Sequence, residues 1–241
     1  MGVPASKIQS STDGGRGPWG LVCALPEELG SLADRPGRSY TRQGFELLEV
    51  EVDGATLVAC VAGVGKVRAA HAAALVIAEG ALRGLFVVGV CGGLRRSLGP
   101  GTLVHCERAV QADFAVRADR EQPADPVLLA AWRACTPAVA GWFLTADRPV
   151  LSLRRRLRLA RAFLGPCVAD METAAVAAVC ARAGVPWAAL RAVTDRSTGA
   201  GIVSFRRHFP SQAGRAADTI PGLLESLRGA GADSAGSSEQ V

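Results

Sequence analysis

The sequence predicts an α/β fold, a single three-layer domain in which helices cover a mixed, largely parallel central sheet. Short apolar runs typical of strands alternate with helical stretches across 19–228. The run 85–90 is apolar throughout, as expected of a strand buried on both faces of a sheet. The length of 241 residues suits one such domain, and a hydrophobic content of 49% excludes disorder over most of the chain.

The first half of the chain is punctuated by proline and glycine. Pro26, followed by two glutamates, is typical of the first turn of a helix. Asp53-Gly54 separates an alternating stretch from an apolar one, which predicts a β-hairpin with a two-residue turn. The predicted elements are a strand at 19–25, a helix from residue 26, hairpin strands at 45–52 and 55–62, a helix at 67–79 and a strand at 85–90.

The second half repeats the alternation of strand and helix. The predicted elements are strands at 102–110, 141–145, 167–169 and 187–194, and helices at 126–134, 151–163, 173–183 and 212–227. Residues 1–18 are rich in Ser, Gly and Pro, which predicts a disordered N-terminal arm. The small and polar composition of 229–241 predicts a disordered tail. The folded domain is therefore expected over 19–228.

Charge, cysteine usage and hydropathy exclude several classes of function. The formal net charge is +5, from 27 basic and 22 acidic residues, and the arginine excess is interpreted as compositional. No basic cluster interleaved with aromatic residues is present, so a nucleic-acid reader is not expected. Seven cysteines without C-x-x-C spacing indicate free buried thiols in a reducing cytoplasm rather than zinc ligands or disulfides. No apolar run is long enough to span a bilayer, and no secretory signal is visible.

Polar and glycine-rich groups follow four of the predicted strands. In parallel sheets ligands bind beyond the carboxyl ends of the strands, so these groups are candidates for one site. Two glycine turns, at 63–66 and 89–93, permit close backbone approach to a ligand, although a plain strand-to-helix turn explains them equally well. Asp170-Met171-Glu172 sets two carboxylates between apolar segments, and helix-dipole stabilisation is the alternative explanation. Arg191, inside an apolar strand, requires carboxylate partners, and Asp195 ends that strand.

Together these motifs resemble the purine nucleoside phosphorylase / uridine phosphorylase superfamily. The resemblance is closest to its 5′-methylthioadenosine / S-adenosylhomocysteine nucleosidase branch and covers roughly residues 19–228. The pieces that carry it are Ala24-Leu25-Pro26-Glu27-Glu28, Gly63-Val64-Gly65-Lys66-Val67, Gly89-Val90-Cys91-Gly92-Gly93-Leu94, Asp170-Met171-Glu172 and Arg191-Ala192-Val193-Thr194-Asp195. Five short motifs in the right order are more specific than any one of them.

The resemblance implies a hydrolase that cleaves the N-glycosidic bond of a 5′-modified adenosine and releases adenine. It implies that Glu28 is the general base that activates water and that Asp195 is the general acid at N7 of the purine. It implies that Met171 and Glu172 hold the ribose and that Arg191 fixes the water and the carboxylates. The further substrate contacts it implies are Thr194, Phe205, Gly63, Val90, Cys91, Gly92 and Val150. It implies neither metal nor other cofactor, and a purine nucleoside and a second copy of the chain, in a homodimer, are the expected partners.

Elementary chemistry agrees with those roles. Cleavage leaves electron density on the base and positive charge on the sugar. A carboxyl group that donates to the ring must stay protonated near neutral pH, which demands a pKa raised by burial or by nearby carboxylates. A second carboxylate must remove a proton from water, as in inverting glycosidases.

Departures from the family pattern keep two alternatives open. Val90 and Cys91 replace Ser and Ala of the family, and of its His-Asp only Ala112-Asp113-Phe114 is recognisable. The stretch 115–126 is shorter than its counterpart, which predicts a different 5′ substituent or dimer contact. A phosphorylase that uses phosphate, with Arg95 and Arg96 as candidate anion ligands, is the first alternative. A nucleoside-binding protein without catalysis is the second.

Overall fold

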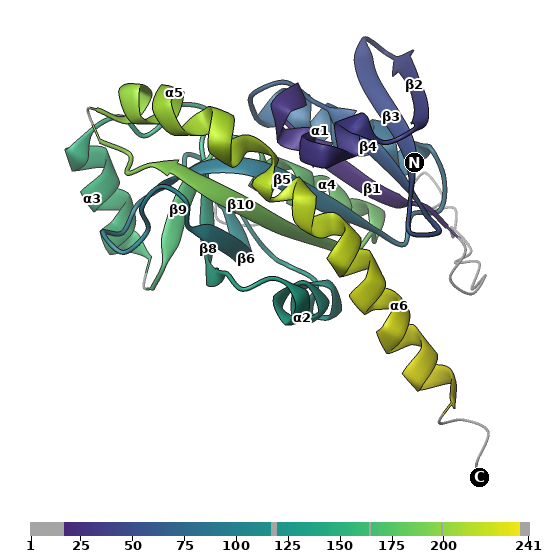
Figure 1. The fold of residues 1–241 in the computed structure, drawn as a ribbon. Helices are drawn as coiled ribbons and strands as arrows, with labels where there is room; N and C mark the ends of the chain where they lie inside the picture. Colours follow the sequence, from purple (N-terminus) through teal and green to yellow (C-terminus); the bar gives the residue numbers. More distant parts are fainter. Residues whose placement is uncertain (1–16, 117–119, 164, 199, 237–241) are drawn as a thin grey trace, which may run out of the picture.

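The computed structural model of the chain describes residues 17–116, 120–163, 165–198 and 200–236, and the side chains of these up to residue 229 (Figure 1). Strands and helices alternate through most of the chain, as predicted. The strands are β1 (Trp19–Cys23), β2 (Gly37–Arg42), β3 (Phe45–Val52), β4 (Ala55–Val61), β5 (Gly84–Gly93), β6 (Leu103–Gln111), β7 (Glu121–Pro123), β8 (Val139–Thr145), β9 (Cys167–Asp170) and β10 (Trp187–Asp195). The helices are α1 (Lys66–Ala78), α2 (Pro126–Cys135), α3 (Leu153–Ala162), α4 (Thr173–Ala183), α5 (Gly201–Gln212) and α6 (Ile220–Gly236), with short 3₁₀ segments η1 (Pro26–Asp34), η2 (Ala213–Arg215) and η3 (Ala217–Thr219).

The sheet closes on itself at one end. β10 pairs with both β5 and β6, and β6, β8, β9 and β5 continue the circuit, so five strands form a closed ring. The strands β1, β4, β3 and β2 extend from β5 as an open sheet. The mixed sheet is confirmed, but the expectation of a largely parallel one needs correction, because five of the ten pairings between the described strands are antiparallel. Closing the ring requires β10 to run antiparallel to β6 and β9 antiparallel to β5, and no local pattern encodes these partners.

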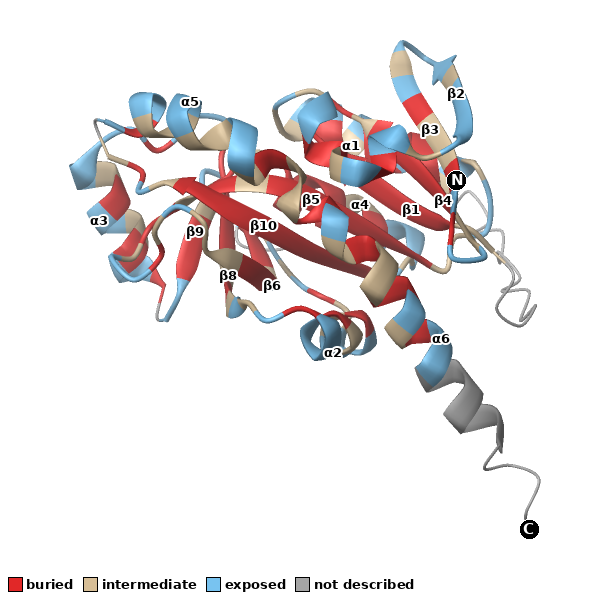
Figure 2. Ribbon diagram, viewed as in Figure 1, coloured by how far each residue is buried: buried red, intermediate tan, exposed pale blue. Residues whose placement is uncertain are grey.

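Alternate residues of the central strands feed two hydrophobic cores. In β5, Leu85 and Val87 face one core, and Phe86 and Val88 face the other. The first core is completed by small residues of α1 and α4, and the second by larger residues of α2 and α6. The buried strands lie between helices whose outward sides are exposed (Figure 2). A strand with both faces covered must be apolar throughout, as the run 85–90 is.

Local signals located most elements but missed three. The Asp53-Gly54 turn is confirmed, and both residues have positive φ, 50° and 79°, as a two-residue hairpin turn requires. β2, β7 and α5 were not predicted. The last helix is also corrected, because α6 begins at Ile220 and continues to Gly236 rather than ending at Leu227. Residues 1–16 and 237–241, which hold most of the predicted arm and the end of the predicted tail, lie outside the described residues, so the 19–228 domain boundary stays a prediction.

All seven cysteines are free thiols that form no disulfide, and only Cys135 is exposed. Among the helices that the structure describes, none has the length and apolar character to cross a membrane.

Candidate active site

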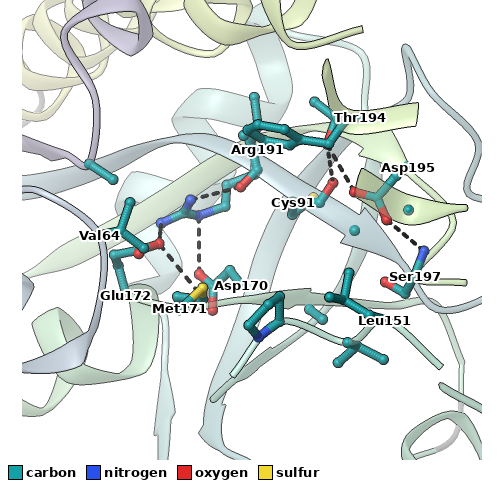
Figure 3. A pocket seen from close by; sticks show the side chains of 18 of the residues that line it. Val64, Cys91, Leu151, Asp170, Met171, Glu172, Arg191, Thr194, Asp195 and Ser197 are labelled. Atoms are coloured by element: carbon teal, nitrogen blue, oxygen red, sulfur yellow. Dashed lines mark hydrogen bonds and ion pairs between the residues drawn. The ribbon is translucent and has the colours of Figure 1, made fainter. Parts of the chain in front are cut away.

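One cavity, of about 310 Å³, collects the carboxyl ends of the central strands (Figure 3). Its walls combine apolar side chains with four carboxylates and one guanidinium. The residues that line it are Ala24, Leu25, Glu28, Val64, Val90, Cys91, Gly92, Pro149, Val150, Leu151, Ala169, Asp170, Met171, Glu172, Arg191, Thr194, Asp195, Ser197, Gly201, Ile202 and Phe205.

Glu28 is held rigidly at the inner wall. Its Oε2 accepts hydrogen bonds from the backbone N–H groups of Ala24 (2.7 Å) and Leu25 (3.0 Å), and its Oε1 accepts one from Val90 (3.0 Å). Gly89 makes this position possible, because a Cβ there would lie 2.5 Å from Oε1. Burial raises the pKa of Glu28, against the opposing effects of Arg191 and the three backbone donors. A buried, oriented carboxylate with a raised pKa has the properties of a general base.

Arg191 is the buried cation at the centre of the site. Its Nε lies 3.1 Å from Asp170 Oδ2 and donates to Thr173 Oγ1 (3.1 Å). Its Nη1 donates to the Val90 carbonyl (2.8 Å), and its Nη2 pairs with Glu172 Oε2 (3.2 Å). Burial lowers the pKa of Arg191, but Asp170 and Glu172 outweigh it, so the guanidinium stays charged. All of its partners are fixed oxygens, so Arg191 positions carboxylates rather than offering a vacant anion site.

Asp170 and Glu172 divide two tasks. Both oxygens of Asp170 are occupied by hydroxyl and N–H donors, from Thr145 and from Thr173, which leaves Asp170 structural. Glu172 accepts from the Gly65 N–H at 2.9 Å and from Arg191, and its carboxylate lines the cavity. Burial raises the pKa of Glu172, although Arg191 lowers it. Glu172 is therefore the carboxylate of this pair that a ligand can reach.

Asp195 lies at the end of β10, away from the Arg191 cluster (Figure 3). Its Oδ1 accepts from the Ser197 N–H (2.7 Å), and its Oδ2 accepts from the Thr194 hydroxyl (3.2 Å). Burial raises the pKa of Asp195, while these two donors and the nearby His208 oppose the rise. Glu172 pairs with Arg191, whereas the groups that bond to Asp195 in the described part of the chain are uncharged. The expectation of a raised pKa at this carboxyl is therefore met by desolvation.

Cys91 lines the cavity but does not have the character of a nucleophile. It is buried, and burial raises the pKa of its thiol far above the usual range. A nucleophilic cysteine needs the opposite, a thiolate stabilised near neutral pH. Its backbone carbonyl accepts from the Thr194 hydroxyl at 3.3 Å, so the residue helps to fix β5 against β10.

An ion cluster ties three loops together beside the cavity. Lys66 Nζ lies 2.8 Å from Asp113 Oδ1 and 3.4 Å from Asp147 Oδ2, and Asp113 Oδ2 accepts the Asp147 N–H at 2.8 Å. Lys66 directly follows Gly65, the donor to Glu172, and Asp147 begins the loop whose residues 149–151 line the cavity. The two aspartates raise the pKa of Lys66 despite partial burial, and Lys66 lowers that of Asp113, also against burial. Asp113 therefore anchors the loops that carry Lys66 and Asp147 beside the cavity.

The structure brings almost all of the predicted site residues into the cavity. Those that line it are Glu28, Val90, Cys91, Gly92, Val150, Met171, Glu172, Arg191, Thr194, Asp195 and Phe205. Gly63 is the exception: it shapes the turn with a φ of 77° and donates its N–H to the Ala24 carbonyl, while Val64 lines the cavity in its place. Sequence reasoning missed Ile202 because α5 was not predicted, and Ser197 because it acts through its backbone N–H. It also missed Leu151, which was assigned to the predicted helix at 151–163 but precedes α3.

The chain is similar to known proteins over most of its length. The sequence profile of the phosphorylase superfamily matches residues 18–227. The 5′-methylthioadenosine/S-adenosylhomocysteine nucleosidase of Mycobacterium bovis is 28% identical, covering 86% of this chain and 97% of that protein. The crystal structure of such a nucleosidase from Neisseria meningitidis, in complex with methylthio-immucillin-A, superposes with a TM-score of 0.82 at 24% identity, covering 87% of this chain and 99% of that one. Futalosine hydrolase of Helicobacter pylori also gives 0.82, at 20% identity, covering 87% and 98%.

Proposed function

Because the chain belongs to the phosphorylase superfamily, we propose that it is a nucleosidase, which uses water to cleave the N-glycosidic bond of a 5′-modified adenosine and releases adenine. The observation that carries this proposal is a pair of separated carboxyl groups in one cavity, the buried Glu28 and the half-buried Asp195. One of them can activate water and the other can protonate the departing base.

The spacing of the two carboxyl groups suits that division of labour. Glu28 binds the N–H of Val90, and Asp195 lies beside Gly92, two residues further along β5. Two residues of a strand span roughly 7 Å. Inverting glycosidases separate their acid and base by roughly 6.5–9.5 Å, which leaves room for the water on the face opposite the leaving group.

The remaining polar groups fit the charges of the transition state. Positive charge develops on the sugar, and Glu172 supplies a nearby carboxylate that also accepts from sugar hydroxyls. Negative charge develops on the base, where a protonated Asp195 donates to N7. Pro149, Val150 and Phe205 provide apolar walls for the purine. Arg191 holds Glu172 in place and thereby positions the sugar rather than reacting with it.

Water is favoured over phosphate as the nucleophile. Arg191 is the one basic residue among the described residues that line the cavity, and its donors are all engaged. Arg95 donates to the carbonyls of Phe163 and Gly165 instead of facing the cavity. A phosphate would therefore meet Glu28 without a free cation, and like charges would oppose its binding.

The 5′ substituent is proposed to be apolar. Val64 lines the cavity beside Glu172 and is exposed, so it offers an apolar contact where a substituent on the sugar would leave the pocket (Figure 3). Methylthioadenosine is the simplest candidate of this class.

The test is a release assay with methylthioadenosine, S-adenosylhomocysteine, adenosine, inosine and futalosine, each with and without phosphate. Adenine and free sugar, formed independently of phosphate, support the proposal. Sugar 1-phosphate formed only with phosphate would assign a phosphorylase, and tight binding without release would assign a binding protein. Asp195→Asn is expected to abolish turnover of a folded protein, whereas the exposed Asp34→Asn, a matched control, leaves turnover unchanged.

A further inference from the structure

Charge is segregated along this chain in a way that composition does not explain. The segments 148–169 and 196–217 contain ten arginines and no aspartate or glutamate. The rest of the chain holds 17 basic and 22 acidic residues and is net acidic, although the whole chain is +5. Both segments contribute residues to the cavity wall, so both lie beside the cavity.

The outward side of α3 combines this charge with exposed aliphatic groups. Leu153 and Leu157 are 54% and 41% exposed, one turn apart. Arg154, Arg158 and Arg161 are exposed beside them at helical spacing, while Arg156 and Ala160 are buried on the inner side. The helix is therefore amphipathic in an unusual sense, because its solvent side carries leucines as well as arginines.

The start of α5 continues the same surface. Ile202 and Val203 are 50% and 65% exposed, and Arg206 and Arg207 are exposed one turn later. A Cβ at Gly201 would lie 3.5 Å from Leu151 Cδ2, so α5 begins in contact with the segment that leads into α3. Both helices lie at the same end of the molecule, with exposed outward sides (Figures 1 and 2). The mouth face is defined by Leu151, Leu153, Leu157, Ile202 and Val203 with Arg148, Arg154, Arg158, Arg161, Arg206 and Arg207.

Two partners fit this face poorly. A second copy related by a two-fold axis would set the same arginines against one another, with no carboxylate in either segment to neutralise them. Single-stranded nucleic acid stacks its bases on aromatic rings, but no exposed ring is found among the described residues of these segments.

We propose that the mouth face docks on an anionic lipid bilayer. Arginines attract acidic headgroups, and the aliphatic side chains between them enter the boundary between headgroups and acyl chains. This mixture of cationic and apolar groups on a helix that lies flat is the pattern of peripheral membrane binding. Docking of this kind turns the opening of the cavity toward the membrane surface.

The test is flotation of the full chain with vesicles of phosphatidylcholine alone or with about 30% phosphatidylglycerol. Wild type is expected to bind the anionic vesicles at least about tenfold better, with binding that weakens as salt rises. Arg154→Gln/Arg158→Gln/Arg161→Gln and, separately, Leu153→Ser/Leu157→Ser are expected to lose about tenfold or more of this binding. A matched triple, Arg38→Gln/Arg42→Gln/Arg133→Gln, removes the same charge from exposed positions elsewhere and is expected to change binding by less than about twofold.

Equal binding to both vesicles, or equal loss in the two triple variants, would overturn the proposal. A mouth-face variant that changes the oligomeric state in sedimentation, or wild type that prefers RNA to anionic vesicles, would overturn it in favour of another partner. None of the five substituted mouth-face positions lines the cavity. The variants are therefore expected to hydrolyse soluble methylthioadenosine at the wild-type rate. This rate distinguishes a failure of docking from a failure of the proposed function.

Discussion

Gly89 gives the sharpest test of the proposed general base. It has a φ of 142°, and an added Cβ would lie 2.5 Å from Glu28 Oε1 and 2.7 Å from Glu28 Cδ. We expect Gly89→Ala to displace the Glu28 carboxylate while leaving every polar group of the cavity chemically intact. The variant thus changes the geometry of the base without changing its chemistry.

The size of the effect follows from that overlap. An ordinary contact begins near 3.4 Å, so the carboxylate must retreat by about 0.9 Å. Such a shift strains its hydrogen bonds from Ala24, Leu25 and Val90. A misplacement of about 1 Å costs roughly 100-fold in rate, or about 2.7 kcal/mol of transition-state stabilisation. The backbone strain adds a loss of stability of about 1–3 kcal/mol, which a domain of this size survives.

The assay measures kcat for adenine release at saturating substrate, together with thermal unfolding. Gly184→Ala is the control, because Gly184 also has a positive φ (67°) but no atom lies within 4 Å of its added Cβ. The control is expected to lose stability while keeping its kcat. A folded Gly89→Ala protein with kcat within about threefold of wild type would refute the reasoning about Glu28.

Four further outcomes are expected. Arg191→Met leaves Asp170 and Glu172 buried without their cation, so the free energy of unfolding should fall by about 3–5 kcal/mol in denaturant titrations. Burial raises the pKa of both Glu28 and Asp195. The kcat should therefore rise with pH as Glu28 loses its proton and fall at higher pH as Asp195 loses its proton. A decline of kcat at alkaline pH that is unchanged in Asp195→Glu would contradict this assignment. Because the pKa of each of these two carboxyl groups is raised in the folded state, the folded state binds the two protons more tightly than the unfolded state does. The stability that these protons contribute is lost as the pH rises through the folded-state pKa values, so the denaturant midpoint of unfolding should fall. Lys66→Met should raise KM several-fold with little change in kcat, and Lys66→Arg should restore it, since Lys66 ties binding loops rather than touching the reacting atoms.

Much of the candidate site could be predicted because its residues follow strands. A buried arginine in an apolar strand, and a carboxylate at that strand's end, are local signals with one physical explanation each. Because β1, β5 and β10 run in parallel, their carboxyl ends converge and bring Glu28 and Asp195 together. Glu172 follows β9, which runs antiparallel to β5, so its place in the site depends on the closure of the ring. Gly63 was assigned to the ligand because a glycine turn is compatible with both roles; only the course of the backbone distinguishes Gly63 from Val64.

Features that depend on distant partners could not be predicted. The pairing of β10 with both β5 and β6 closes the ring, but nothing within 187–195 encodes two partners of opposite direction. The interpretation of the arginines as compositional was drawn from their number. Their placement is more informative than their number, because two segments far apart in sequence come together as one surface and neither segment contains an aspartate or glutamate.

Glu28 and Arg191 are held by groups from several strands, so the cavity should unfold cooperatively, as one unit. Glu28 is fixed by backbone donors from the ends of β1 and β5, and Arg191 joins β10 to the β5 carbonyl of Val90 and to the residues after β9. Opening any one of these strands releases a buried charge from its partners, so no partly unfolded form retains the arrangement. Catalytic activity should then vanish in the same denaturant interval as the tertiary circular-dichroism signal. The activity that remains at a given denaturant concentration then measures the fraction of molecules in which the ring of five strands is intact.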